Sequence, residues 1–228
     1  MKSFVIFGFW TDFSLLGTTL DDTIEVQKRI DQSKLTFNKY LKIWNAKKIT
    51  FEQKIKYYKT LIISKLLYNC QTWSLNKKET KKLNWTIRKH LRRILHIFYP
   101  NKITNKLLYK KCKCQPIEFT IFKRRWNLYR EILINEQIPA HKILEYYIQI
   151  QENTTYQKFK GKPRITILTT LKNDFKHLNL TFNNEKDLLR LKTLAKGKKT
   201  WEIMSQRILN KIKKNCKETS RANPEHSI

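Results

Sequence analysis

The sequence predicts a mainly α-helical protein, and three observations lead to this expectation. Glycine and proline are scarce, four and five among 228 residues, which argues against a turn-rich β architecture. Apolar residues recur at helical spacing over most of the chain after Asp21. Hydrophobic residues make up 40% of the chain and aromatic residues 12%, so the chain can bury a real core. We therefore expect a short N-terminal β-hairpin followed by a helical bundle and a smaller, basic helical C-terminal unit.

The first twenty residues predict the hairpin, with Gly8 and Gly17 as strand breakers. Residues 4–10 are apolar and aromatic, but they are too few to span a membrane. Asp12 follows them closely, without the small-residue cleavage site of a signal peptide. We therefore expect an intracellular protein, nuclear or cytoplasmic, that is not secreted and has no membrane partner.

Three long helices are expected in the first half of the chain. The first covers residues 23–46 and is opened by the adjacent acids Asp21 and Asp22, which favour the helix dipole. The second follows a cap at Thr50. The third covers residues 77–97 and ends before Pro100, with an apolar stripe on one face and basic residues mostly off it. The stripe consists of Leu83, Ile87, Leu91, Ile94 and Leu95.

Shorter helices are expected further along the chain, over residues 104–111, 116–135, 139–150, 163–178 and 184–210. Gly197 is expected to divide the last of these. The polar segment 151–162 shows no helical repeat and is interpreted as a linker. The expected organisation is a hairpin (1–20), a helical domain (21–150), this linker, a basic helical unit (163–210) and a flexible tail (211–228).

The charge is the strongest indication of function. Forty-eight lysines and arginines against eighteen acids give a formal net charge of +30. Such a field attracts polyanions, and a nucleic-acid backbone offsets it best because each neutralised phosphate releases counterions. An anionic membrane is a weaker expectation, since the chain has no long apolar run and no dominant basic amphipathic helix.

No catalytic or metal site is expected from the residues. Asp21-Asp22 invites comparison with the paired aspartates of polymerases, but two-metal chemistry needs carboxylates from at least two places. Only Asp12 precedes the pair, so a helix start is the better interpretation. The histidines show no ligand spacing, and no phosphate-binding glycine loop or serine nucleophile motif occurs. Cys112 and Cys114 are too close for a zinc knuckle, and the four cysteines are expected to be free thiols.

Three basic clusters are the candidate nucleic-acid contacts, each weighed against a solvated or packed role. Arg88-Lys89 and Arg92-Arg93 recur four residues apart along one side of the third helix. Lys123-Arg124-Arg125 precedes Trp126, for which a core position is favoured over a stacking platform. Lys158, Lys160, Lys162 and Arg164 occupy a loop with Gly161 and Pro163. Other aromatic residues are expected to pack, namely Trp44, Tyr58, Tyr68 and Trp73.

Taken in order, several blocks resemble the C-terminal part of a non-LTR retrotransposon reverse transcriptase of the endonuclease-reverse transcriptase type. The resemblance covers about residues 13–209, and each block is weak alone. The blocks are Leu15-Leu16-Gly17, Ile24-Glu25 with Arg29-Ile30, Lys54 with the run after it, Leu66-Leu67-Tyr68 with Trp73, Leu91-Arg92-Arg93-Ile94-Leu95 with Ile103-Thr104-Asn105, Arg125-Trp126 with Gly161-Lys162-Pro163-Arg164, and Ala195 with Trp201. Departures include Asn69 and Gln71, where the family usually has Gly and Glu, Leu128-Tyr129 in place of Gly-His, and Ile167 and Gly197 where Trp and Asp are common.

The resemblance implies a thumb-like helical domain over residues 21–150 that grips a template–primer duplex by its backbone, after a hairpin that is a remnant of the palm and primer grip. It implies a fragment of a transposable element's RNA-directed DNA polymerase, a nucleotidyltransferase, with the catalytic aspartates and their magnesium in a palm before Met1. The chain alone is then expected to be inactive, without a cofactor. Two alternatives stay open: a stand-alone basic RNA-binding or ribosome-associated protein, and an incomplete version of an active enzyme. The sequence predicts no oligomeric state.

Overall fold

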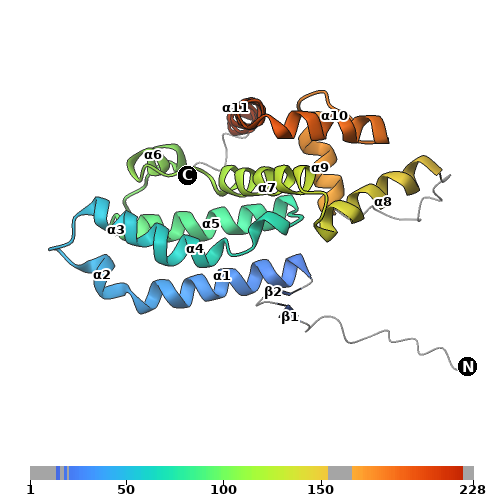
Figure 1. The fold of residues 1–228 in the computed structure, drawn as a ribbon. Coiled ribbons are helices and arrows are strands. Elements are labelled where there is room, and N and C mark those ends of the chain that lie inside the picture. The colour runs from blue at the N-terminus through green and yellow to red at the C-terminus, as the bar shows by residue number, and fades with distance from the viewer. Residues whose placement is uncertain (1–13, 16–17, 20, 154–165, 223–228) are drawn as a thin grey trace, which may run out of the picture. The chain divides into compact units, whose positions relative to one another are not determined.

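The computed structural model describes residues 14–15, 18–19, 21–153 and 166–222, and these are mainly helical (Figure 1). The chain divides into two compact units, residues 1–120 and 121–228. The division falls within helix α7 (Ile117–Ile134), earlier than the boundary near residue 150 that the sequence suggested. Helix α8 (Pro139–Asn153) extends into the expected linker, and residues 154–162 of that linker lie outside the described residues.

The hairpin expected over residues 1–20 is not supported. Among the residues described there, Ser14–Leu15 (β1) and Thr18–Thr19 (β2) pair antiparallel, with Ser14 opposite Thr19 and Leu15 opposite Thr18. The strand expected at residues 4–10 lies outside the described residues. The mainly α class is thus confirmed by the helices alone.

Helix α1 (Asp22–Lys39) begins at the aspartate pair, as predicted. The Asp21 carboxylate accepts from the backbone N–H groups of Thr23 (2.7 Å) and Ile24 (3.1 Å), which caps the helix. The Asp22 carboxylate accepts from the backbone N–H of Ser74 at 2.9 Å. Burial raises the pKa of Asp22, and the neighbouring acids Glu79, Asp21 and Glu25 add to the shift. Both acids therefore have structural partners at the helix start.

The single helix predicted over residues 23–46 is wrong, because the chain breaks at Tyr40. Helix α2 (Leu41–Asn45) follows the break and brings Trp44 back onto Phe37, with ring centroids 5.2 Å apart. The Trp44 indole Nε1 also donates to the Phe37 carbonyl at 2.9 Å. The free energy gained by burying this large indole, with its N–H hydrogen-bonded, exceeds what one continuous helix would gain.

The second predicted helix forms in three parts with different geometry. Helix α3 (Phe51–Tyr57) is capped by Thr50, whose side chain and that of Gln53 form a capping box. It continues as a π-helical segment, η1 (Tyr58–Ile63), and as α4 (Ser64–Leu66). Tyr58, Ile62 and Leu66 are all fully buried, so the wider π turn keeps side chains four residues apart on the inner face. A short 3-10 turn, η2 (Cys70–Thr72), leads to the next helix.

Helix α5 (Lys77–Ile94) has the apolar face that the sequence predicted, with Leu83, Ile87, Leu91 and Ile94 buried. Asn76 and Glu79 form its capping box. Its end differs from the prediction, because it stops at Ile94, three residues before the predicted end at residue 97. His96 adopts a left-handed conformation (φ 53°), and the Ile97 N–H donates to the Arg92 carbonyl at 2.9 Å. This is a Schellman motif, which ends the helix without proline.

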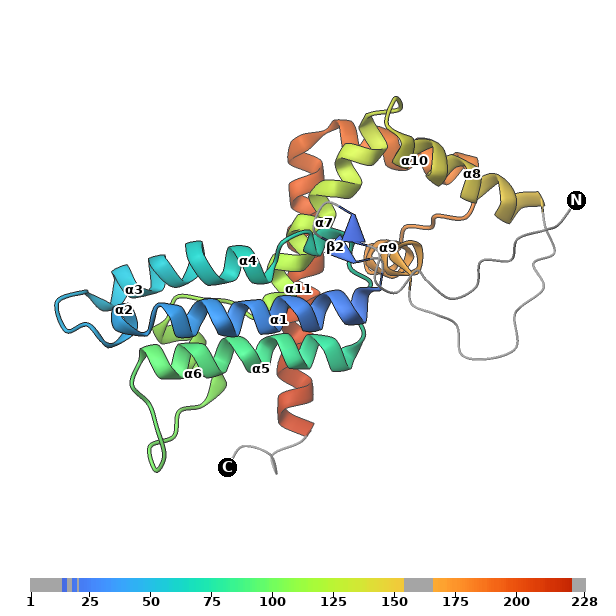
Figure 2. The same ribbon diagram turned by 90° about the horizontal axis from the view of Figure 1, so that it is seen from below.

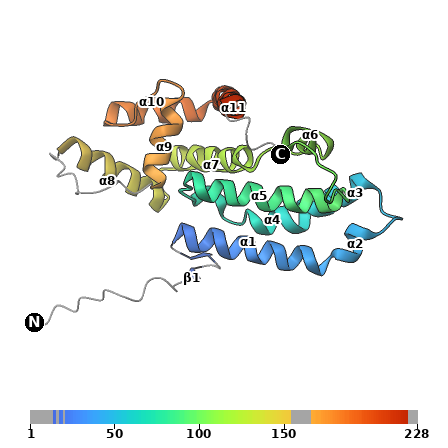
Figure 3. The ribbon, with the colours of Figure 1, turned by 180° about the vertical axis from the view of Figure 1, so that it is seen from behind.

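In the first unit, α1 lies beside both α4 and α5, and α6 (Asn105–Lys111) lies beside α5 (Figures 2 and 3). The buried Asn84 of α5 ties this helix to α6 and to the start of α7. Its amide donates to Glu118 at 2.6 Å, and its oxygen accepts from the Tyr109 hydroxyl and the Ile117 N–H, each at 3.2 Å. A satisfied buried amide of this kind fixes the rotation of α5 about its own axis.

The second unit contains α7 from Ile121 onward, α8, α9 (Ile167–Lys176), α10 (Glu185–Lys196) and α11 (Lys198–Ala222). Trp126 and Trp201 stack at 4.4 Å, and each indole donates to the other residue's carbonyl at 3.1 Å. Gly197 separates α10 from α11, as predicted. Helix α11 continues to Ala222, past residue 211 where we expected a flexible tail. No helix in the described ranges combines the length and the apolar character that crossing a membrane requires.

Candidate nucleic-acid interface

The four cations predicted on α5 separate into two pairs with different surroundings. Arg88 and Arg92 are half-buried, whereas Lys89 and Arg93 are exposed. Residues four apart lie above one another on a helix, so each pair shares one side of it. The four cations recur at four-residue spacing, as the sequence indicates, but the two pairs have different neighbours.

Arg88 and Arg92 are held against α6. An Arg92 guanidinium nitrogen donates to the Asn105 side-chain oxygen at 2.8 Å. Arg88 hydrogen-bonds to Tyr109, whose pKa is raised to about 12, mainly by burial. Burial lowers the pKa of Arg92, and the positive charge of Arg88 adds to this shift. These two arginines therefore have local structural partners on the protein.

Lys89 and Arg93 belong to a longer row of exposed side chains, which we call the α5 stripe. Its members follow one another at intervals of four, three, four and four residues, which places them on one side of the helix. The α5 stripe consists of Lys78, Lys82, Trp85, Lys89 and Arg93. Among the described residues, no carboxylate forms an ion pair with any of its four cations.

Trp85 is the feature of this surface that the sequence analysis missed. The side chain is 55% exposed, whereas Trp44, Trp73, Trp126 and Trp201 are at most 1% exposed. The Lys89 ammonium lies 5.1 Å from the centre of its ring, a cation–π contact. The signal was available, because Trp85 interrupts the basic row at helical spacing and lies off the apolar stripe.

Two hollows adjoin the α5 stripe. The first, of about 180 Å³, lies between α1 and α5 and includes Lys34, Asn38, Trp85, Lys89 and Arg93 in its lining. The second, of about 300 Å³, is lined by Trp85, Lys89, Arg92, Arg93, Ile97 and Phe98. Both are lined by aromatic or aliphatic side chains together with cations. The Schellman turn at His96 carries the chain into Ile97 and Phe98, two lining residues of the second hollow.

His90 lies buried beneath this surface. Its ring stacks on Phe37 with centroids 4.2 Å apart, and its Nδ1 lies 3.3 Å from the Tyr58 hydroxyl. Burial lowers the pKa of His90 to about 4, and the positive charges of Lys89, Lys34 and Arg93 lower it further. A neutral His90 is thus part of the core that supports α5 at neutral pH.

The second predicted cluster, on α7, includes a buried ion pair. Arg125 binds Asp174 of α9 at 2.8 and 2.9 Å, with side chains 11% and 10% exposed. Trp126 is in the core, as favoured from the sequence, while Lys123 and Arg124 are exposed. The predicted group Lys123-Arg124-Arg125 therefore has its third member turned toward the protein, and Arg125 stabilises the second unit. The third cluster, with Lys160, Lys162 and Arg164, lies outside the described residues.

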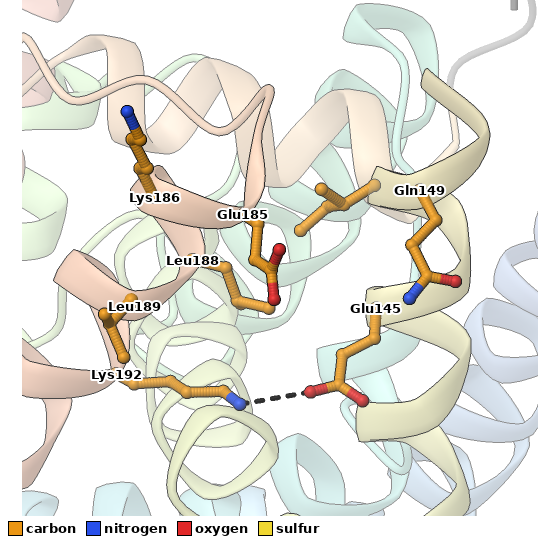
Figure 4. Close-up of a pocket in the computed structure, with 8 residues that line it drawn as sticks. Glu145, Gln149, Glu185, Lys186, Leu188, Leu189 and Lys192 are labelled. Atoms are coloured by element: carbon orange, nitrogen blue, oxygen red, sulfur yellow. Dashed lines mark hydrogen bonds and ion pairs between the residues drawn. The ribbon is translucent and has the colours of Figure 1, made fainter. Parts of the chain in front are cut away.

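A larger hollow, of about 390 Å³, lies between α8 and α10 in the second unit (Figure 4). Its charges are balanced, unlike those of the α5 stripe. The Lys192 ammonium lies 3.1 Å from Glu145 and 3.2 Å from Glu136, and the Glu145 carboxylate also contacts His141 Nε2 at 2.9 Å. The hydrogen bond from Lys192 is the main cause of the lowered pKa of Glu145. These contacts join α8 to α10 and leave little net charge to attract a polyanion.

No chemical centre is evident in the described parts of the chain. They contain no group of three or more histidines, cysteines or acids that could hold a metal ion. Burial raises the pKa of the Cys112 thiol to about 11 and also raises that of Cys114, so neither is an activated thiolate. Among the described candidate sites, the α5 stripe has the clearest geometry for binding an anion.

No protein family, curated protein or solved structure matches this chain. What bears on function is therefore the α5 stripe, the charge of the chain and the sequence blocks.

Proposed function

We propose that this protein binds nucleic acid through the phosphate backbone, with the α5 stripe as the main contact surface and with little sequence preference. The observation that carries the proposal is the row of four exposed cations on one side of a capped, rigid helix. Backbone phosphates need positive side chains in a fixed arrangement and no base-specific donors or acceptors. A duplex or hybrid bound in this way is recognised by its shape and backbone.

We also propose that the protein is related to the thumb region of non-LTR retrotransposon reverse transcriptases. Support comes from the burial of residues in the blocks that carry the resemblance. These buried residues include Glu25, Arg29, Ile30, Lys54, Leu66, Leu67, Trp73, Leu91, Ile94, Trp126, Ala195 and Trp201. Proteins that share a fold are expected to resemble one another most at the residues that form the core.

Blocks that are distant in the sequence also meet in space. Arg29 forms a buried ion pair with Glu25 at 2.5 Å, and its guanidinium lies 4.6 Å from the centre of the Tyr68 ring. Trp126 and Trp201, from the two last blocks, stack on each other. Asn69 has a φ of 55°, at a position where the family usually has glycine. Asparagine tolerates this left-handed conformation better than most residues, so the departure keeps the same backbone requirement.

Salt dependence of binding tests the proposed contact surface. If each cation of the α5 stripe meets one phosphate, changing Lys78, Lys82, Lys89 and Arg93 to Ala lowers the slope of log K against log salt by about 3–4 on duplex nucleic acid. Binding of the full chain to a template–primer hybrid would be measured by fluorescence anisotropy over a salt series. Several unrelated duplex sequences should lose affinity equally.

A variant with the same loss of charge is the control. Lys42, Lys47, Lys48 and Lys56 are exposed lysines of the first unit that line neither hollow beside α5. Changing them to Ala should alter the slope much less than changing the α5 stripe. Equal slopes for the two variants would mean that net charge alone drives binding and that α5 has no special role. Absence of binding at low salt would contradict the proposed function itself.

A further inference from the structure

The surface of α5 has an aromatic component that contact with phosphates does not explain. A row of lysines and arginines is sufficient for a duplex backbone, whose bases are already stacked on one another. Yet Trp85 lies within the row, 55% exposed, and Phe98 on the wall of the second hollow is 56% exposed. Single exposed aromatic residues are common, but Trp85, Ile97 and Phe98 line one hollow together, and grouped exposed apolar side chains mark binding surfaces.

We propose that Trp85 and the hollow beside it form a stacking site for an unpaired nucleobase, so that the α5 stripe binds single-stranded nucleic acid in preference to duplex. This inference rests on the proposed function and specifies its ligand. Proteins that hold single strands combine a cationic track for the backbone with aromatic faces on which bases stack. The α5 stripe has this order, because Lys82 precedes Trp85 by three residues and Lys89 follows it by four.

The dimensions of the stripe agree with this arrangement. At 1.5 Å per residue, Lys82 and Lys89 are separated by about 10 Å along the helix axis, with Trp85 between them. The hollow of about 300 Å³ is lined by the apolar Ile97 and Phe98 and by the cations Lys89, Arg92 and Arg93, besides Trp85. Apolar lining residues suit the face of a base, and the cations among them suit the phosphates on either side of it. Charge complementarity thus favours a polyanion with planar groups over an apolar peptide.

The neighbouring residues hold Trp85 in a fixed place. Thr86 and Ile87, which follow it on α5, are buried, and so is Asn84, which precedes it. The Asn84 hydrogen bonds to Glu118, Tyr109 and Ile117 fix the rotation of the helix. The Lys89 ammonium, 5.1 Å from the ring centre, places a positive charge beside the site. A preorganised aromatic face loses little side-chain entropy when a base stacks on it.

The test compares oligonucleotides that differ only in their bases. The probes are a short single-stranded oligothymidylate and an abasic strand of the same length, which keeps the phosphates and lacks the bases. We expect the full chain to bind the base-bearing strand about tenfold more tightly, at the lower end of what one or two stacked bases contribute. Trp85→Ala should remove most of this preference and leave the salt slope unchanged. Trp85→Phe, which keeps an aromatic face, should retain part of it.

Tyr146→Ala is the matched control, because Tyr146 is a 65% exposed aromatic residue of the second unit and lies outside the α5 stripe. It should preserve the preference for bases. Equal affinities for the two strands in the unmodified protein would overturn the inference, while binding of both would leave the proposed function intact. A shift from dimer to monomer in sedimentation on changing Trp85 to Ala would overturn it too, since the surface would then be a contact between two copies. Binding of neither strand nor duplex at low salt would instead remove the proposed function.

Discussion

Two clusters in this protein contain the same residue types, basic residues close to a tryptophan, but one tryptophan is exposed and the other is buried. On α5, Lys89 and Arg93 lie beside Trp85, and on α7, Lys123, Arg124 and Arg125 precede Trp126. The α5 tryptophan is 55% exposed, whereas the α7 tryptophan is 1% exposed and stacked on Trp201. The residue types alone therefore do not tell which of the two tryptophans is exposed and which is in the core.

The difference has two physical causes. The first is helical phase, because Trp85 lies within the cationic row of α5, whereas Trp126 lies in line with the buried Phe122, Tyr129 and Leu133 of α7. The second is the availability of an acid. Asp174 on α9 reaches Arg125, but no carboxylate among the described residues pairs with Lys89 or Arg93. A basic and aromatic cluster is thus expected to bind a ligand only where the surrounding fold leaves both its rings and its charges exposed.

Truncating the two tryptophans gives the largest expected contrast in stability. Trp126→Ala removes a buried indole, its ring contacts and the hydrogen bond that its Nε1 donates to the Trp201 carbonyl, so we expect the free energy of unfolding to fall by about 5 kcal/mol. Trp85→Ala should change it by no more than about 0.5 kcal/mol, as is usual for exposed positions. Urea unfolding followed by circular dichroism would measure both. A large loss of unfolding free energy for Trp85→Ala would mean that its ring stabilises the fold and is not available to a ligand.

Breaking the ion pair of the α7 cluster should have the next largest effect. Asp174→Ala leaves the buried Arg125 guanidinium without its carboxylate, which is expected to lower the free energy of unfolding by about 4 kcal/mol. The double variant Arg125→Met/Asp174→Leu removes both charges and should recover most of this loss. Lys89→Ala is the matched exposed change, with an expected loss of at most about 0.5 kcal/mol. If Asp174→Ala unfolded no more easily than Lys89→Ala, the two clusters would not differ in the way the structure indicates.

Much of the fold was predictable because local rules decided it. Apolar spacing gave the helices of both units, and the caps at Asp21 and Thr50 have the side-chain hydrogen bonds that their residue types favour. Tertiary contacts decided the rest. The break at Tyr40 exists because Trp44 stacks on Phe37, a contact that no pattern within one helix contains. The end of α5 depends on His96 in a left-handed conformation. From residue types alone, the nearby Pro100 is the more obvious end of the helix.

The candidate site was only half predictable for the same reason. Spacing found Arg88, Lys89, Arg92 and Arg93, but their division depends on Tyr109 and Asn105, which belong to another helix. In the sequence Arg125 does not differ from its two basic neighbours. Its partner Asp174 lies forty-nine residues later, so only the fold distinguishes it. Trp85 could have been found from the pattern, since it lies in a row of cations and off the apolar stripe.

The titration of His90 gives a smaller effect that reports directly on the charge of the α5 surface. With a pKa of about 4 in the folded protein and 6.5 when unfolded, His90 is neutral in both states above pH 6.5. Between pH 6.5 and 4 the unfolded chain takes up a proton that the folded one does not. Folding stability is therefore lost as the pH falls through this window, by about 3 kcal/mol from this residue.

A variant without the imidazole isolates this contribution from that of the carboxylates. The difference in unfolding free energy between the unmodified protein and His90→Gln should change over the window from pH 6.5 to 4 and be constant above it. Because Lys89 and Arg93 add to the lowering that burial causes, Lys89→Ala/Arg93→Ala should raise the pKa of His90, which an NMR titration of its ring would measure. The same pKa should rise when phosphates bind the α5 stripe. If neither change moved it, the charges on α5 would already be neutralised in solution, and the contrast with the paired Arg125 would disappear.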